Sequence, residues 1–111
     1  MRIMAMTALA TMLAGCATTG SYGSAETLGS ETNPVRVQGP KGERAYLDRL
    51  RCADGSAPAY ERRGSGSARG DGHIVDFYDV TCPGAEPVTI IMDMYHSGSE
   101  ARPVPGFTIV N

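Results

Sequence analysis

Two stretches in the second half of the chain alternate apolar and polar residues, the pattern of a strand that buries one face. Residues 74–82 (IVDFYDVTC) are rich in β-branched and aromatic side chains, as strands usually are. Residues 88–96 (VTIIMDMYH) place one apolar set on a single face, namely Val88, Ile90, Met92 and Met94. The PGAEP segment between the stretches consists largely of turn formers. The pattern therefore predicts an antiparallel hairpin.

Residues 42–52 (GERAYLDRLRC) fit either a helix or a strand. A helix places Tyr46, Leu47 and Leu50 on one face and leaves the charged side chains outside. A strand would put Asp48 on the same face as Tyr46 and Leu50. The helix keeps the charges in water, so it is the favoured interpretation.

Shorter apolar runs complete the predicted domain. Residues 58–63 form a candidate strand, a glycine-rich connection follows at 64–72, and residues 107–110 form a terminal strand. The predicted fold class is α+β, with a short N-terminal helix on an antiparallel sheet of three or four strands. A small all-β sandwich or barrel is the alternative. The globular domain is expected at residues 40–111.

The segment before this domain is rich in Ser, Thr, Gly and Ala. From residue 17 to 33 its only sizeable apolar side chains are Tyr22 and Leu28, too few to bury a core. Residues 16–39 are therefore predicted to be a flexible tether. Val35-Arg36-Val37 can add a short edge strand, bracketed by Pro34 and Pro40.

The N-terminus has the layout of an export signal. Arg2 is the only charged side chain before Glu26, and residues 3–14 are uncharged and mostly apolar. Twelve helical residues span about 18 Å, short of the ~30 Å hydrocarbon core of a bilayer. The pattern favours a signal peptide over a permanent transmembrane helix.

Leu13-Ala14-Gly15-Cys16, at the end of this apolar run, resembles the lipobox of bacterial lipoproteins. The resemblance implies that residues 1–15 are a signal peptide and that Cys16 becomes a lipid-bearing N-terminus. The lipid chains then anchor the protein to a membrane. Ala17, rather than Asp, follows the cysteine, which in that family favours the outer membrane with the domain in the periplasm. The expected localisation is the bacterial cell envelope.

Composition and charge limit the classes of partner that the chain is expected to bind. Without residues 1–15 the chain has nine basic and twelve acidic residues, a net charge of −3. A mildly acidic chain of this kind argues against nucleic acid as a partner. The leading interpretation is a non-enzymatic lipoprotein, without a cofactor, whose small domain contacts an envelope protein or the cell wall.

Cys52 and Cys82 remain as a pair once Cys16 is assigned to the lipid. An even number of cysteines in an exported protein favours a disulfide. Neither cysteine belongs to a C-x-x-C pair, so redox catalysis and zinc binding are poorly supported. The predicted Cys52–Cys82 bond joins the helix to the sheet.

A metal site is a weaker hypothesis, with His73, Asp76, Asp93 and His96 as candidate ligands. Asp93 and His96 lie three residues apart, and on a continuous strand they would point to opposite faces. They are therefore not expected to form a ligand pair by themselves. No arrangement of Ser, His and Asp or of Cys and His typical of a nucleophilic enzyme is recognisable, so no catalytic residue is assigned.

An alternative function is inhibition of an enzyme. Cys52-Ala53-Asp54-Gly55 is similar to a Cys followed closely by Asp-Gly in small periplasmic lipoproteins that inhibit C-type lysozymes. That resemblance covers four residues and implies a compact, β-rich, disulfide-bonded domain.

Overall fold

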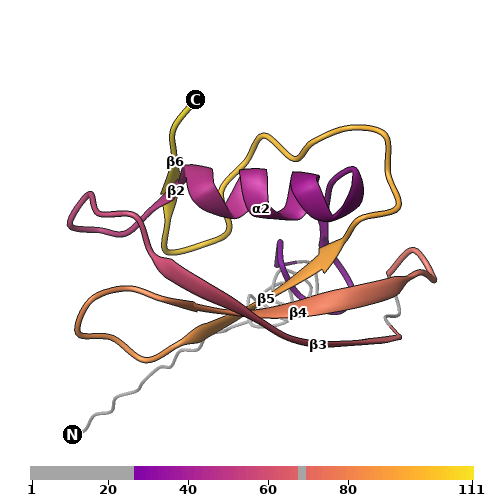
Figure 1. The fold of residues 1–111 in the computed structure, drawn as a ribbon, viewed down its shortest axis with the longest axis horizontal. Helices are drawn as coiled ribbons and strands as arrows, with labels where there is room; N and C mark the ends of the chain where they lie inside the picture. The colour runs from indigo at the N-terminus through magenta and orange to yellow at the C-terminus, as the bar shows by residue number, and fades with distance from the viewer. Residues whose placement is uncertain (1–26, 68–69) are drawn as a thin grey trace, which may run out of the picture.

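The structure, a computed structural model, describes residues 27–67 and 70–111. This part of the chain forms one helix and six strands (Figure 1). In chain order they are β1 (Val35–Arg36), α2 (Gly39–Arg49), β2 (Leu50–Arg51), β3 (Ala59–Ser67), β4 (Ile74–Thr81), β5 (Val88–Asp93) and β6 (Thr108–Ile109). The predicted signal peptide and Cys16 lie outside the described residues.

The main sheet has four strands in the order β1-β5-β4-β3. Strand β4 pairs antiparallel with β3 and with β5, so the predicted hairpin is confirmed. Strand β1 pairs in parallel with β5, with Val35 opposite Met92. Strand β3 extends to Ser67, into the segment expected to be a glycine-rich connection, and its register shifts between Arg62 and Gly64.

Helix α2 lies across one face of this sheet (Figure 1). It begins at Gly39-Pro40, and proline suits the first helical turn because the missing N–H has no helical partner there. Glu43, Tyr46 and Leu47 are its buried residues, a spacing of i, i+3, i+4 that faces the core. The helical interpretation of residues 42–52 is thus right as far as Arg49. Leu50 is extended, and β2 pairs antiparallel with β6.

The hydrophobic core fills the space between α2 and the main sheet. Its buried members come from both ends of the chain that the structure describes: Val35, Val37, Tyr46, Leu47, Leu50, Tyr78, Val80, Ile90, Met92 and Val104. Val35 and Val37 belong to the segment expected to be a tether, and both are fully buried. From Leu28 onward, that segment therefore packs as part of the domain.

The predicted fold class is wrong in three respects. The helix is not N-terminal, because β1 precedes it, and the main sheet is mixed rather than antiparallel. A second, two-stranded sheet also forms between β2 and β6, so strands dominate the fold. Sequence periodicity does not reveal β1 or β2, because each strand is two residues long and is hydrogen-bonded to a strand distant in sequence.

In the described ranges, no helix has the length and apolar character needed to cross a membrane.

Candidate metal centre

Four side chains of types that bind metal ions converge at one end of the main sheet. Asp71 and His73 precede β4, Asp93 is the last residue of β5, and His96 follows three residues later. Each offers one ligand atom, and these four atoms all lie within 4.8 Å of one another. We call these four residues the His/Asp cluster.

Strand pairing explains why these segments meet. Asp76 of β4 lies opposite Met92 of β5, so the start of β4 is beside the end of β5. Asp71 and His73 lie just before β4, and Gly72 between them has φ +81°, a conformation that favours glycine. The antiparallel register thus brings the loop between β3 and β4 to Asp93.

The distances within the His/Asp cluster are short. His73 Nδ1 lies 2.7 Å from Asp93 Oδ2. His96 Nε2 lies 2.9 Å from Asp71 Oδ2 and 3.2 Å from Asp93 Oδ2. The two imidazole rings are 5.3 Å apart between centroids. One nitrogen of each histidine therefore points at the carboxylate oxygens.

The two carboxyl groups have different surroundings. Asp93 is fully buried, which by itself raises its pKa, but the backbone N–H of Tyr95 and the two histidines outweigh burial and keep that pKa below its usual value. Hydrogen bonding to Arg36 lowers the pKa of Asp71. Both groups are therefore carboxylates at neutral pH, the form that binds a cation.

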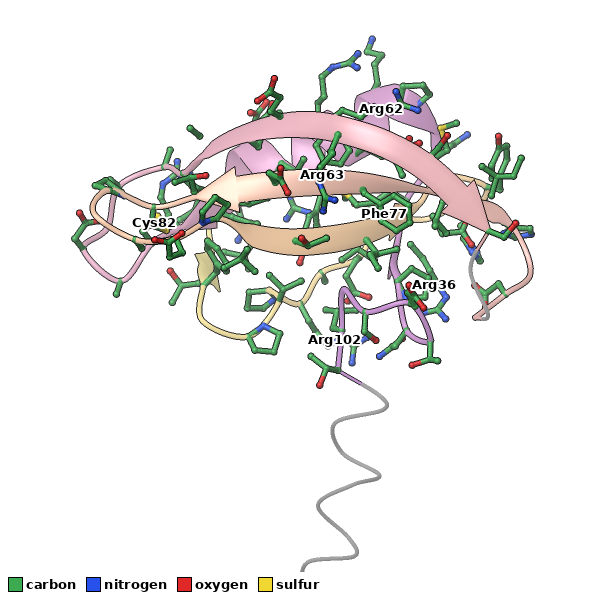
Figure 2. All side chains as sticks on the ribbon, turned by 90° about the horizontal axis from the view of Figure 1, so that it is seen from below. Arg36, Arg62, Arg63, Phe77, Cys82 and Arg102 are labelled. Carbon is green, nitrogen blue, oxygen red and sulfur yellow. A yellow bond between two sulfur atoms is a disulfide. The ribbon has the colours of Figure 1, made fainter. Side chains whose placement is uncertain are left out.

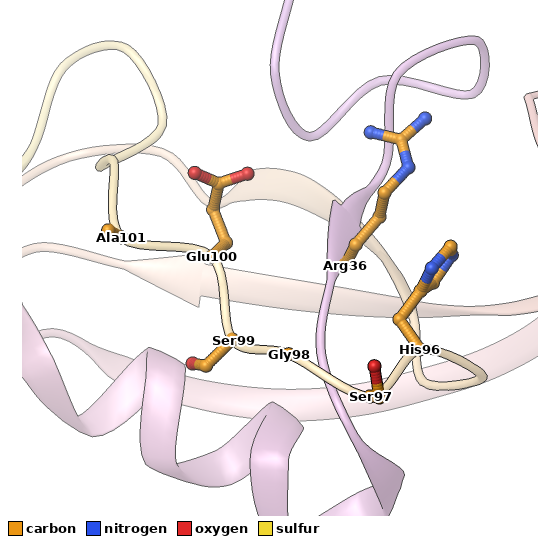
Figure 3. Close-up of a pocket in the computed structure, with 7 residues that line it drawn as sticks. All are labelled: Arg36, His96, Ser97, Gly98, Ser99, Glu100 and Ala101. Atoms are coloured by element: carbon orange, nitrogen blue, oxygen red, sulfur yellow. The ribbon is translucent and has the colours of Figure 1, made fainter.

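The His/Asp cluster is open to solvent on one side. The side chains of Asp71, His73 and His96 are 29%, 38% and 28% exposed, whereas that of Asp93 is buried. Arg36 and His96 also line a polar pocket of about 310 Å³ together with residues 97–101 (Figure 3). An ion can therefore reach the cluster without opening the fold.

Three of the four residues proposed from the sequence as metal ligands meet here, namely His73, Asp93 and His96. Asp76 does not, because its side chain turns toward α2 and binds Arg62 at 3.0 Å. The expectation that Asp93 and His96 diverge is wrong, since β5 ends at Asp93 and the chain turns before His96. Sequence reasoning missed Asp71; the Asp-x-His spacing directly before a strand was the available signal.

The predicted disulfide is confirmed. Cys52, just after β2, bonds to Cys82, just after β4, with the Cα atoms 5.9 Å apart. Figure 2 shows Cys82 and Arg36 toward opposite ends of the main sheet. The disulfide and the His/Asp cluster therefore lie at opposite ends of β4.

Near the disulfide, Asp54 accepts hydrogen bonds from the backbone N–H and the hydroxyl of Ser56. These hydrogen bonds stabilise the local turn.

The arginines of β3 pair with acids of β4 on both faces of the sheet. Arg62 binds Asp76 on the helix side, and Arg63 binds Asp79 at 3.0 Å on the face turned away from α2 (Figure 2). The Arg63–Asp79 pair is exposed on both sides and adds under about 1 kcal/mol, whereas Asp76 is buried beneath its arginine. Much of the basic and acidic charge is thus paired within the domain.

Comparisons with protein-family models, with curated proteins and with solved structures find no match for this chain.

Proposed function

We propose that the domain binds a divalent transition-metal ion at the His/Asp cluster. The observation that carries the proposal is the convergence of two imidazole nitrogens and two carboxylate oxygens within 4.8 Å. Imidazole favours first-row transition metals, whereas sites for Mg²⁺ and Ca²⁺ are built from oxygen ligands. The two carboxylates carry a charge of −2, of which Arg36 offsets one unit, and the remaining negative charge favours a cation.

The His/Asp cluster also suits an ion that holds the fold together. Its residues come from the loop before β4, the end of β5 and the turn after β5. The disulfide already joins segments at the other end of β4. A bound ion would cross-link the end of the sheet that has no covalent link, and binding to the folded state alone raises stability.

The test is metal binding by the purified full chain, prepared without a polyhistidine tag and stripped with a chelator. We expect one Zn²⁺ per chain by calorimetric titration. At a free ion concentration of 100 times Kd, stability rises by about 2.7 kcal/mol, or roughly 10–20 °C in Tm for a domain of this size. His73→Ala and His96→Ala are expected to weaken binding by more than about 100-fold, since losing a ligand exceeds the effect of losing an outer-shell partner.

Asp79→Asn is the matched control, because it removes a carboxylate of β4 that lies outside the cluster. This variant is expected to bind zinc as the unchanged protein does. Absence of stoichiometric binding in the unchanged protein, or equal binding by both histidine variants, would refute the metal-site proposal.

We further propose that the domain is displayed in the bacterial envelope by a lipid on Cys16. The support is the Leu13-Ala14-Gly15-Cys16 sequence after an uncharged apolar run. The domain begins its packing near Leu28, which leaves about ten residues between the anchor and the fold.

Cys16→Ser tests the anchor separately from the metal site. The unchanged protein is expected to partition into the detergent phase and Cys16→Ser into the aqueous phase. The variant lacks the two or three acyl chains that would insert into the detergent micelle. Thr18→Ala, two residues away, is expected to behave as the unchanged protein. Detergent partitioning of Cys16→Ser after signal cleavage would contradict the anchor.

A further inference from the structure

We infer that the His/Asp cluster selects a four-coordinate zinc ion, and that Arg36 sets this selectivity by restricting how Asp71 binds the metal. The inference rests on the metal-binding function proposed above and names the ion and the residue that discriminates it. It is carried by the hydrogen bonds that each carboxylate of the cluster already makes.

Arg36 donates a hydrogen bond to each oxygen of the Asp71 carboxylate. Its Nε donates to Oδ2 at 2.6 Å and its Nη2 to Oδ1 at 3.1 Å. A guanidinium fork and a chelated metal ion approach a carboxylate from the same edge, between its two oxygens. While Arg36 is in place, Asp71 can therefore give the metal one oxygen only, and Oδ2 is the one that faces His96.

Arg36 is itself held in position. Its Nη1 donates to the side-chain oxygen of Asn33 at 2.8 Å and to the carbonyl of Pro34 at 3.1 Å. Its backbone belongs to β1, where Arg36 lies opposite Asp93. The guanidinium is fixed by contacts outside the cluster, so it does not depend on the ion for its orientation.

The backbone occupies one oxygen of the Asp93 carboxylate. Its Oδ1 accepts the N–H of Tyr95 at 3.0 Å, and Oδ2 faces the two histidines. Each carboxylate therefore offers one oxygen and each histidine one nitrogen. Four single donors match the tetrahedral preference of Zn²⁺, whereas Ca²⁺ takes six to eight oxygens, often from bidentate carboxylates, and Mn²⁺ prefers octahedral oxygen ligands.

The first test reads the geometry directly. Co²⁺ replaces Zn²⁺ at many sites, and a tetrahedral Co²⁺ complex absorbs visible light far more strongly than an octahedral one. Co²⁺ bound to the unchanged protein is expected to give the intense tetrahedral spectrum, which added Zn²⁺ abolishes. A weak, octahedral spectrum would overturn the four-coordinate assignment while leaving metal binding intact.

The second test removes the two hydrogen bonds from Arg36 to Asp71. Arg36→Gln is expected to lower zinc affinity by about 10–100-fold, as the loss of an outer-shell partner does, and to lower Mn²⁺ affinity less, so that the Zn²⁺ to Mn²⁺ affinity ratio falls. Arg36→Lys keeps the charge but cannot form the fork, and is expected to lose selectivity too. The Co²⁺ spectrum of both variants is expected to weaken toward higher coordination.

Arg102→Gln is the control, since Arg102 pairs with Glu100 through a similar two-point contact outside the cluster. Circular dichroism establishes whether each variant is folded. If Arg36→Gln does not fold, Arg36→Lys is compared with the unchanged protein instead. An unchanged Zn²⁺ to Mn²⁺ ratio in a folded Arg36 variant would refute the role of Arg36. Failure of the unchanged protein to bind any metal would refute the proposed function itself.

Discussion

Replacing both Cys52 and Cys82 by alanine is expected to lower the free energy of unfolding by roughly 2–5 kcal/mol. The bond closes a loop across a sequence separation of 30 residues, for which chain entropy alone predicts about 3–4 kcal/mol. Domains of this size have total stabilities of about 5–15 kcal/mol, so the variant loses a large share. Denaturant unfolding of both proteins at the same pH measures the difference.

The disulfide prediction has two internal controls. Unchanged protein treated with a reductant is expected to match the double variant, because both lack the same cross-link. Thiol labelling of unreduced, denatured protein is expected to modify neither Cys52 nor Cys82. Stoichiometric labelling of both cysteines in the unreduced protein, or equal unfolding midpoints of variant and unchanged protein, would show that the bond is not part of the working structure.

The free energy of unfolding is expected to fall as the pH rises, because of the buried side chain of Glu43. Its side chain lies on the inner face of α2 and is 1% exposed. Its Oε1 accepts a hydrogen bond from the hydroxyl of Tyr78 at 3.2 Å. Its Oε2 has no hydrogen-bond partner among the described residues. Burial, followed by the neighbouring Asp76 carboxyl group, raises the pKa of Glu43 to about 8. At neutral pH the folded protein therefore keeps a proton on Glu43.

The sign of the pH effect follows from this proton. In the unfolded chain Glu43 titrates near pH 4.5, its ordinary value. Between about pH 4.5 and pH 8 the folded state binds a proton that the unfolded state has released, so the free energy of unfolding decreases with pH. The contribution is complete below pH 4.5 and lost above pH 8. One proton changes stability by about 1.4 kcal/mol per pH unit, so the full effect has an upper bound of about 4–5 kcal/mol.

Glu43→Gln is expected to remove this slope, because an amide has nearly the shape of the protonated acid and no charge to bury. The variant and the unchanged protein should agree within about 1 kcal/mol near pH 5, and the variant should be the more stable by several kcal/mol at pH 9. Denaturant unfolding at three pH values, with a chelator present throughout, measures the difference. Glu61→Gln, at an exposed position of β3, is the control. Parallel pH profiles of Glu43→Gln and the unchanged protein would refute the assignment.

Local pattern was sufficient for the elements that are long enough to carry it. Alternation over residues 74–82 and 88–96 predicts β4 and β5, and the shared face of Tyr46 and Leu47 predicts most of α2. The predictions of β4 and α2 succeeded because burial of one face has the same period as the element itself. In β5 the strand was predicted but its one-sided burial was not confirmed, because residues 90–93 are all buried and Val88 is exposed. The cysteine pair was predicted by count and context: the chain was expected to be exported, and two remaining cysteines have one pairing to make.

The two shortest strands could not be recognised in the same way. Two residues show no period, and β1 exists because β5 supplies its hydrogen bonds and the core buries Val35. The burial of Glu43 was equally hidden, because a charged residue on a helix is usually assigned to the outside. In the fold its carboxyl group meets the hydroxyl of Tyr78 on β4.

Pattern and composition alone reveal the apolar N-terminal run that ends at Cys16, the hairpin of β4 and β5, the burial of Tyr46 and Leu47 on α2, and the cysteine pair. The parallel position of β1 and the membership of the His/Asp cluster depend on how the elements pack in three dimensions. Asp71 enters the cluster and Asp76 leaves it because the end of β5 lies beside the start of β4 and Arg36 holds Asp71 there. Periodicity reports which side of an element a residue faces, whereas a ligand set depends on where strands end and in which register they pair.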